Sequence, residues 1–310
     1  MGNEQTWIKR LLFATDFSHC AYHAEEHAAF LSQAYGATVD VVHVLELYPG
    51  VYAAVEDHSE TDERLQETVR RLQRSTVPVT GHQLIGIPSV QICEAAMKFH
   101  ADLIVLGTRG KTGLDHFLLG STAERVLTIA PCPVLTVRVP KGRDVQDQKA
   151  PITFKQIVVP VDFSLCSLDA LEYGTQIAMD FGASLELLHV LEPVAYDDDR
   201  TLAQQAKQDQ LKEGIDAQFR RYVSAIQAAG VSVREVIRGG VPADTILESA
   251  RASAGDLIVM GTHGRRGISY VMRGSVAEAV LRRASCPVLA VRNAHFGANH
   301  QRVVPMETTT

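Results

Sequence analysis

The sequence predicts an α/β protein built from two tandem domains, each a doubly wound, Rossmann-like parallel sheet of five strands. Three observations support this fold class. The chain has 310 residues, enough for two domains of about 150 residues, each with its own core. Short aliphatic runs alternate with amphipathic segments along the chain, as they do in repeated strand–helix units. One stretch also occurs twice, so the chain divides into two equivalent halves.

The repeated stretch covers residues 101–139 and 255–293, which align without gaps and share 21 of 39 residues. Between the halves, the chain is polar and lacks hydrophobic periodicity, as a linker would. The resulting division is a first domain at 1–140, a linker at 141–154, a second domain at 155–293 and a polar tail at 294–310.

The strands are predicted from continuous aliphatic runs, which are typical of strands buried on both faces. In the first half they are expected at Arg10–Thr15, Thr38–Leu45, Val77–Ile85, Leu103–Leu106 and Pro133–Val139. In the second half they are expected at Gln156–Val161, Ser184–Leu191, Val231–Arg238, Leu257–Met260 and Pro287–Arg292. Each fifth strand would leave an exposed edge if it were unpaired. We therefore expect the halves to pack together there as a pseudo-two-fold pair.

The helices are predicted from periodicity and capping residues. The first helices follow an Asp-Phe-Ser sequence, which caps well, and end before a glycine. The third helices carry proline in their first turn. In the first half the helices are expected at about His19–Tyr35 and Ser59–Ser75, from Pro88, and from Gly120-Ser121. In the second half they are expected at about Leu165–Phe181 and Arg200–Ala229, from Pro242, and from Gly274-Ser275, so the second helix is longer here.

A glycine pattern, Gly-x2-Gly-x9-Gly-Ser, follows the fourth strand in both halves. Glycines let backbone N–H groups approach an anion, and a serine at a helix start adds a hydroxyl to the positive end of the helix dipole. Cations in each loop would complete a phosphate site. The alternative is a plain turn in which Ser121 and Ser275 are ordinary N-caps. We expect Gly120 and Gly274 to adopt a φ that other residues avoid.

At these residues the chain resembles the universal stress protein family, and the resemblance covers nearly the whole chain twice. It implies a fold like that of the adenine nucleotide alpha hydrolases, with strand order 3-2-1-4-5 in each sheet. It also implies ATP as the ligand, with Mg bound through the phosphates. The first-strand aspartate and the end of strand two would meet the adenine end of ATP, while the glycine loop would take the ribose and phosphates.

Carried over by position, this resemblance implies two sites. The first would use Asp16, Val44, Gly107, Arg109, Gly110, Gly120, Ser121 and Thr122. The second would use Asp162, Val190, Gly261, His263, Gly264, Gly274, Ser275 and Val276. The halves differ at two places. The residue two before the aspartate is Ala14 in one half and Pro160 in the other, and Val276 lacks the hydroxyl that Thr122 offers. The two sites need not be equal.

The resemblance implies a nucleotide-dependent stress-response regulator with at most slow ATP hydrolysis, and no catalytic residue is assigned. The sequence has no nucleophile elbow and no metalloprotease helix motif. One alternative is an ATP-dependent transferase or hydrolase, in which His263 or Asp162 would act as the base. Others are a ligand such as a nucleotide-linked lipid precursor, or an interaction protein with vestigial sites.

Composition limits the partners. The net charge of −6 gives no basic field for nucleic acid, so any anion site must be local. No apolar run approaches the length of a membrane helix, and the first residues lack a signal-peptide core. We therefore expect a cytoplasmic protein without nucleic acid or membrane partners, and the resemblance implies an adenine nucleotide as its partner. A homodimer on top of the internal pair of halves is a further expectation.

Histidines and cysteines are expected to have structural roles. His19, His23 and His27 share one stripe of the first helix, which could hold a metal but is interpreted as a solvent-facing stripe. No metal site is therefore assigned. His43 and His189, at equivalent places on the second strands, are expected to be core histidines with hydrogen-bond partners. The five cysteines lack a C-x2-C pair, and four lie at equivalent places, as packing residues would.

Overall fold

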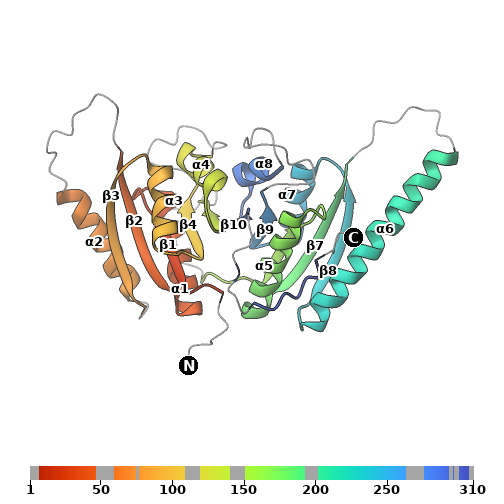
Figure 1. Ribbon diagram of the computed structural model, residues 1–310, viewed down its shortest axis with the longest axis horizontal. Coiled ribbons are helices and arrows are strands. Elements are labelled where there is room, and N and C mark those ends of the chain that lie inside the picture. Colours follow the sequence, from red (N-terminus) through yellow and green to blue (C-terminus); the bar gives the residue numbers. More distant parts are fainter. Residues whose placement is uncertain are drawn as a thin grey trace. The chain divides into compact units, whose positions relative to one another are not determined.

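The computed structural model describes residues 7–46, 59–74, 77–108, 119–139, 151–192, 202–262, 276–292, 296 and 300–306, with side chains from 213 onward in the long helix that begins at Leu202 (Figure 1). The chain forms two compact units. Unit 1 contains Met1–Ile152 and Arg266–His300, and unit 2 contains Thr153–Arg265 and Gln301–Thr310. Unit 1 therefore contains the first half and the last part of the second half, and unit 2 contains the rest of the second half and the C-terminal tail.

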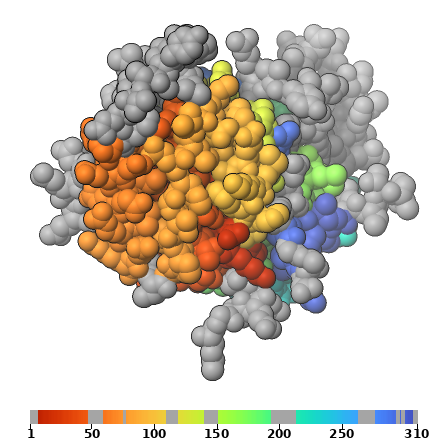
Figure 2. All heavy atoms as spheres, turned by 60° about the vertical axis from the view of Figure 1, so that its left-hand side comes forward, coloured from red at the N-terminus to blue at the C-terminus, as the bar shows by residue number. Residues whose placement is uncertain are grey.

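Unit 1 holds a parallel sheet with strand order β3-β2-β1-β4-β5, as predicted for the first half. Helices α1 and α2 cover one face of this sheet, and α3 and α4 cover the other. Figure 2 shows the outer surface over α2, β3 and α3 (orange) as continuous. The elements are β1 Arg10–Ala14, α1 His19–Tyr35, β2 Thr38–Glu46, α2 Ser59–Gln73, β3 Val79–Gly86, α3 Pro88–Lys98, β4 Leu103–Gly107, α4 Ser121–Ile129 and β5 Val134–Val137.

Unit 1 also contains the last two elements of the second half, α8 (Val276–Arg283) and β10 (Val288–Val291). Strand β10 pairs antiparallel with β5, with Leu289 opposite Leu135. Two arginines at equivalent repeat positions make reciprocal contacts here: Arg138 donates to the carbonyl oxygen of Arg282, and Arg292 donates to that of Thr128. The predicted pseudo-two-fold pairing of the fifth strands is confirmed.

Unit 2 repeats the same topology through its fourth strand, with the parallel order β8-β7-β6-β9. Its second helix is longer than α2, as predicted. The elements are β6 Gln156–Pro160, α5 Leu165–Phe181, β7 Ser184–Leu191, α6 Leu202–Ala228, β8 Val233–Gly239, α7 Pro242–Ala252 and β9 Leu257–Gly261.

Local sequence explains the boundaries of the two first helices. Ser18 caps α1 by accepting a hydrogen bond from Ala21 N at 3.3 Å, and Ser164 caps α5 in the same way. Gly36 and Gly182 end these helices with φ values of 65° and 64°, and each backbone N–H bonds the last turn. Glycine suits this left-handed C-cap because it has no Cβ.

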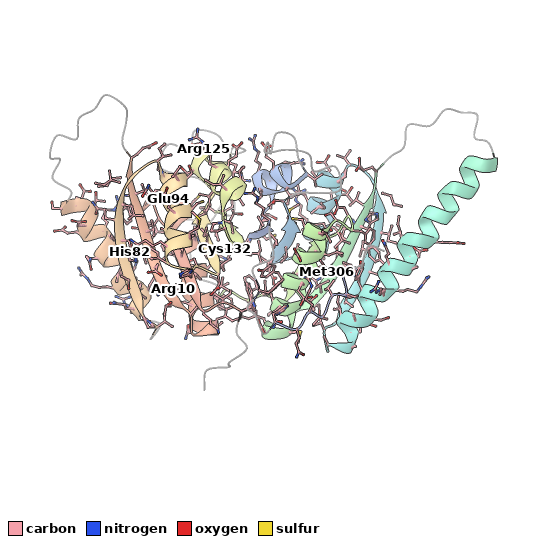
Figure 3. All side chains as sticks on the ribbon, viewed as in Figure 1. Arg10, His82, Glu94, Arg125, Cys132 and Met306 are labelled. Carbon is pink, nitrogen blue, oxygen red and sulfur yellow. The ribbon has the colours of Figure 1, made fainter. Side chains whose placement is uncertain are left out.

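A charged residue lies inside each sheet, on the second strand. Asp40 on β2 contacts the His82 ring at 2.8 Å and the Arg10 side chain at 3.5 Å, from the strands on either side (Figure 3). The equivalent Glu186 on β7 is fully buried and bonds Arg234 and Ser249. Pairing and hydrogen bonding offset the desolvation of these carboxylates.

The segment 301–306, predicted only as part of a polar tail, docks on α5 and ends at Met306 (Figure 3). Arg302 bonds Asp169 at 2.7 Å. The Glu172 carboxylate, 1% exposed, accepts the backbone N–H groups of Val303 at 3.1 Å and Val304 at 2.7 Å. The segment therefore belongs to the folded core of unit 2.

Replacing Glu172 by glutamine should lower the free energy of unfolding by about 2–4 kcal/mol, because hydrogen bonds to a charged acceptor contribute about 1.5–3 kcal/mol each. The amides of Val303 and Val304 should then exchange with solvent faster. The matched control is Glu26→Gln at the equivalent position of α1, where the side chain is 29% exposed. Similar, small losses in both variants, measured by denaturant unfolding and hydrogen exchange, would contradict this account.

All five cysteines lie within the described residues, and none of them forms a disulfide. Burial raises the pKa of Cys93 and of Cys132 to about 12, so both stay protonated and unreactive at neutral pH. Of the four cysteines predicted as packing residues, Cys20 and Cys132 are buried, whereas Cys166 and Cys286 are only partly buried. Within the described ranges, no helix is both long and apolar enough to cross a bilayer.

Candidate functional site

The first-strand aspartates lie in a tight turn between strand and helix. Thr15 N donates to Val42 O at 2.9 Å, which extends the β1–β2 pairing to the edge of the sheet. Phe17 then adopts a left-handed φ of 60°, and Asp16 Oδ1 accepts the Ser18 N–H at 3.0 Å. The turn therefore presents the Asp16 carboxylate at the carboxyl end of β1, where ligands bind in open parallel sheets.

The second copy of this turn is similar, with one addition. Phe163 has a φ of 63°, and Asp162 Oδ1 accepts from Ser164 N at 3.0 Å and from Ser164 Oγ at 2.6 Å. Asp162 N also donates to Ser167 Oγ at 3.3 Å. The equivalent of Ser167 is Ala21, which has no hydroxyl, so this contact belongs to the second repeat.

The ends of the second strands lie beside these turns. Strand β2 pairs with β1 up to Ala14 opposite Val42, and Val44 follows two residues later at the same edge. In unit 2, Val161 N donates to Leu188 O at 2.8 Å, which places Val190 in the equivalent position. Both valines are half-buried. The structure therefore places the end of strand two near each aspartate turn, and the role of these valines in ligand binding stays a prediction.

Gly107 and Gly261 end the fourth strands, where the first helices pass very close. A Cβ added to Gly107 would lie 2.9 Å from the Cys20 carbonyl carbon, and one added to Gly261 would lie 2.9 Å from that of Cys166. Real Cβ atoms do not approach backbone this closely. Helix packing therefore explains why glycine stands at both positions, independently of any ligand.

Replacing Gly107 by alanine should destabilise unit 1 by about 1–3 kcal/mol, the usual cost of overpacking a filled site. Gly261→Ala should do the same in unit 2. The control is Gly214→Ala, in helix α6 with no atom within 4 Å of the added Cβ. That change should stabilise by about 0.5–1 kcal/mol. If denaturant unfolding shows all three variants equally stable, the close packing is wrong.

The start of α4 is tied to the end of β4. Thr108 N donates to Val137 O at 3.0 Å, and Gly120 N donates to Thr108 O at 2.8 Å. Gly120 is the N-cap, without a side-chain cap bond, and Ser121 is the first, exposed helical residue. The interpretation of Ser121 as an N-cap is therefore wrong. The expected special φ is also wrong, because Gly120 has an ordinary φ of −62°.

This arrangement leaves polar groups at the helix start. The first N–H groups of an α-helix have no intrahelical acceptor, and here no cap side chain fills that role. The neighbouring Thr108 hydroxyl is buried, and among the described residues it meets no hydrogen-bond partner. Thr122 is half-buried in the first turn. Chemically, this edge offers backbone and hydroxyl donors to an anion.

Six predicted site residues lie outside the described residues: Arg109, Gly110, His263, Gly264, Gly274 and Ser275. Val276, predicted for the second site, is the first residue of α8, which belongs to unit 1. Its place beside Asp162 stays a prediction. For the first site, the structure brings Asp16, Val44 and Gly107 to one edge of one sheet.

The histidine stripe on α1 does not form a metal cluster. The ring centroids of His19 and His23 lie 5.0 Å apart with the rings tilted by 59°, and His27 Nδ1 donates to His23 O at 2.8 Å. Burial lowers the pKa of His27, and the stripe is half-buried, not solvent-facing as expected. Across the part of the chain that the structure describes, no three His, Cys, Asp or Glu side chains gather in a way that could hold a metal ion.

Sequence reasoning missed the left-handed phenylalanines, Phe17 and Phe163. The sequence predictions assign the repeated Asp-Phe-Ser to capping and its aspartate to the ligand, but give the phenylalanine no role, although its occurrence in both halves is an available signal. His43 and His189 were predicted to be core histidines with hydrogen-bond partners, and this is confirmed. Their Nδ1 atoms lie 2.8 Å and 2.7 Å from the carbonyl oxygens of Thr15 and Val161.

Comparison with known proteins identifies the repeated domain. The sequence model of the universal stress protein family matches residues 8–138 and 153–292. A universal stress protein of Methanocaldococcus jannaschii is 36% identical over 148 residues, covering 45% of this chain and 87% of the relative. One of Synechocystis is 25% identical over 316 residues, covering 92% of this chain and 100% of the relative.

The fold is similar to that of a solved relative of the same tandem length. The crystal structure of a universal stress protein from Archaeoglobus fulgidus covers 92% of this chain and 96% of its own, with a TM-score of 0.70 and 24% identity. At that identity the likeness concerns the fold alone. Because the family match spans both repeats and most of the sequence, the chain belongs to the universal stress protein family.

Proposed function

We propose that the chain binds ATP, with Mg held through the phosphates, at one or both repeated sites. It would act as a nucleotide-dependent regulator of a stress response in the cytoplasm, with at most slow ATP hydrolysis. The domains at 1–140 and 155–293 would each supply one site. In the first, Asp16 and the Val44 backbone would meet the adenine end of ATP, and the start of α4 would take the phosphates.

The observation that carries this proposal is the start of α4. Gly120 N donates to Thr108 O at 2.8 Å, which holds the helix start against β4. The glycine N-cap has no side chain that could cover the first turn. The N–H groups that follow therefore face the end of the helix where the dipole favours negative charge. A phosphate is the ligand that such a helix start accommodates best.

The hydrogen-bond donors at this edge of the sheet suit a nucleoside triphosphate. In the part of the chain that the structure describes, the buried Thr108 hydroxyl bonds no other group, and the exposed Ser121 stands at the first helical position. The site chemistry supplies donors for phosphate oxygens, while the carboxylate of Asp16 suits the donor groups of a base or ribose. Mg prefers phosphate oxygens and water to an all-protein cage, so the nucleotide itself would bring it.

The enzyme alternative has less support. Oδ1 of Asp162 already accepts the Ser164 hydroxyl at 2.6 Å and the Ser164 N–H at 3.0 Å, so it is poorly placed to take a proton from a substrate. His263, the other candidate base, lies outside the described residues. Release of inorganic phosphate from ATP and Mg at several turnovers per second would favour the enzyme.

Mass spectrometry of small molecules released from purified, denatured protein tests the ligand. We expect an adenine nucleotide, at up to two per chain. Release of a nucleotide-linked molecule without adenine would favour the alternative ligand class over ATP. Protein that carries no nucleotide and takes none up on incubation with ATP, ADP or AMP would contradict the proposal.

A further inference from the structure

In both repeats, a buried histidine holds the residue directly before the site aspartate. His43 on β2 is 7% exposed, and its Nδ1 lies 2.8 Å from Thr15 O. His189 on β7 is 8% exposed, and its Nδ1 lies 2.7 Å from Val161 O. A carbonyl oxygen only accepts, so Nδ1 carries the proton in each case. The histidine thus fixes the backbone at the start of each aspartate turn.

The same histidine also contacts the residue directly after the aspartate. The Phe17 ring packs on His43 with centroids 4.4 Å apart, and the Phe163 ring packs on His189 at 4.9 Å. These phenylalanines have left-handed φ values of 60° and 63°. Residues other than glycine keep such a conformation only when the surroundings hold it, and they often do so at binding sites. Each aspartate is therefore held on both sides by one histidine.

The outer support of this turn differs between the repeats. In unit 1, the Arg64 guanidinium lies 4.8 Å from the Phe17 ring centroid and donates to Phe17 O at 3.1 Å. In unit 2, Phe163 packs on Phe219 at 5.8 Å and on Tyr222 at 6.2 Å. The second helices thus support the turn by different chemistry, whereas the histidine contacts are the same. The histidine contacts are therefore common to both turns, as is the hydrogen bond from the serine N–H to the aspartate.

From this repeated geometry we infer that His43 and His189 are positioning residues for nucleotide binding. Each holds its aspartate, Asp16 or Asp162, in the orientation that the base or ribose of the ligand requires, without touching the ligand. The inference rests on the proposed function and adds the residues that pre-organise the site. Pre-organisation raises affinity because the turn need not be ordered on binding.

The test replaces His43 in a chain whose second site is blocked by Gly274→Asp, so that ATP with Mg reports the first site alone. His43→Phe keeps an aromatic ring but removes the donor to Thr15 O, and affinity should fall about tenfold or more. His43→Asn restores a donor near the Nδ1 position, and it should recover much of the loss. The control His82→Asn, on β3 and bonded to Asp40, should bind as the parent does.

A double-mutant cycle separates positioning from general destabilisation. In an Asp16→Ala background, His43→Phe should cause little further loss of affinity, because the residue it positions is gone. An equal loss in both backgrounds would overturn the inference, and so would parental affinity in the single variant.

A ligand-free measurement distinguishes failure of this inference from failure of the proposed function. The Ser18 amide donates to Asp16 Oδ1 at 3.0 Å. Its hydrogen exchange should accelerate about tenfold in His43→Phe but not in His43→Asn, if the histidine sets the turn. If exchange accelerates in His43→Phe but the parent chain binds no nucleotide, the proposed function is refuted, and the inference about ligand positioning with it. Unchanged exchange would refute the histidine's role even if ATP binds.

Discussion

Replacing Gly120 by aspartate should abolish nucleotide binding at the first site while it strengthens helix α4. Gly120 is the N-cap at an ordinary φ of −62°, a conformation that aspartate adopts without strain. An aspartate cap would accept the first-turn N–H groups, and caps of this kind stabilise a helix by a few tenths of a kcal/mol over glycine. The same carboxylate would occupy the donors of the phosphate and repel its charge.

The loss of affinity should be large. Losing even two charge-assisted hydrogen bonds to phosphate, at about 1.5–3 kcal/mol each, weakens a site by more than about a hundredfold. Gly274→Asp is the matched variant of the second repeat. Each single variant should bind one nucleotide per chain and the double variant none, with thermal unfolding unchanged or shifted upward. Two nucleotides bound to a folded Gly120→Asp chain would show that this helix start does not bind phosphate.

The isolated first repeat, residues 1–140, should not remain a monomer in solution. Without β10, strand β5 becomes a sheet edge whose side chains are at most 2% exposed in the full chain, from Val134 to Val137. A flat apolar edge is a template for pairing with another chain. Size-exclusion chromatography with light scattering should show dimers or aggregates.

A lysine placed on the exposed β5 edge provides the control for the truncated repeat. Thr136→Lys in residues 1–140 places a charge on the unpaired strand and should reduce association, because edge lysines block strand addition. A truncated first repeat that is soluble and strictly monomeric without this change would contradict the role of the β5–β10 pair.

Sequence predicted the elements well because each depends on local signals. Ser18 and Gly36 delimit α1 by capping, and proline marks the start of α3, so these boundaries follow from neighbouring residues. The pairing of β5 with β10 was also predictable, since an unpaired apolar edge strand needs a partner. Because the sequence repeats, each of these signals occurs twice in the chain.

The site was predicted less completely because its details depend on contacts distant in sequence. Gly107 is required by the approach of Cys20 in α1, which no spacing within the glycine pattern reveals. Ser121 resembles an N-cap in sequence, but the tie from Gly120 to Thr108 moves the cap back by one residue. Docking of the tail on Glu172 likewise needs the fold, because a polar segment gives no periodic signal.

Calorimetric titration of the full-length chain with ATP and Mg is the most direct test of the proposed function. We expect saturable heat with up to two nucleotides bound per chain. Gly120→Asp should remove one of these nucleotides, and adding Gly274→Asp should remove all binding. A folded wild-type chain, freed of any copurified ligand, that shows no saturable heat with ATP, ADP or AMP would contradict it.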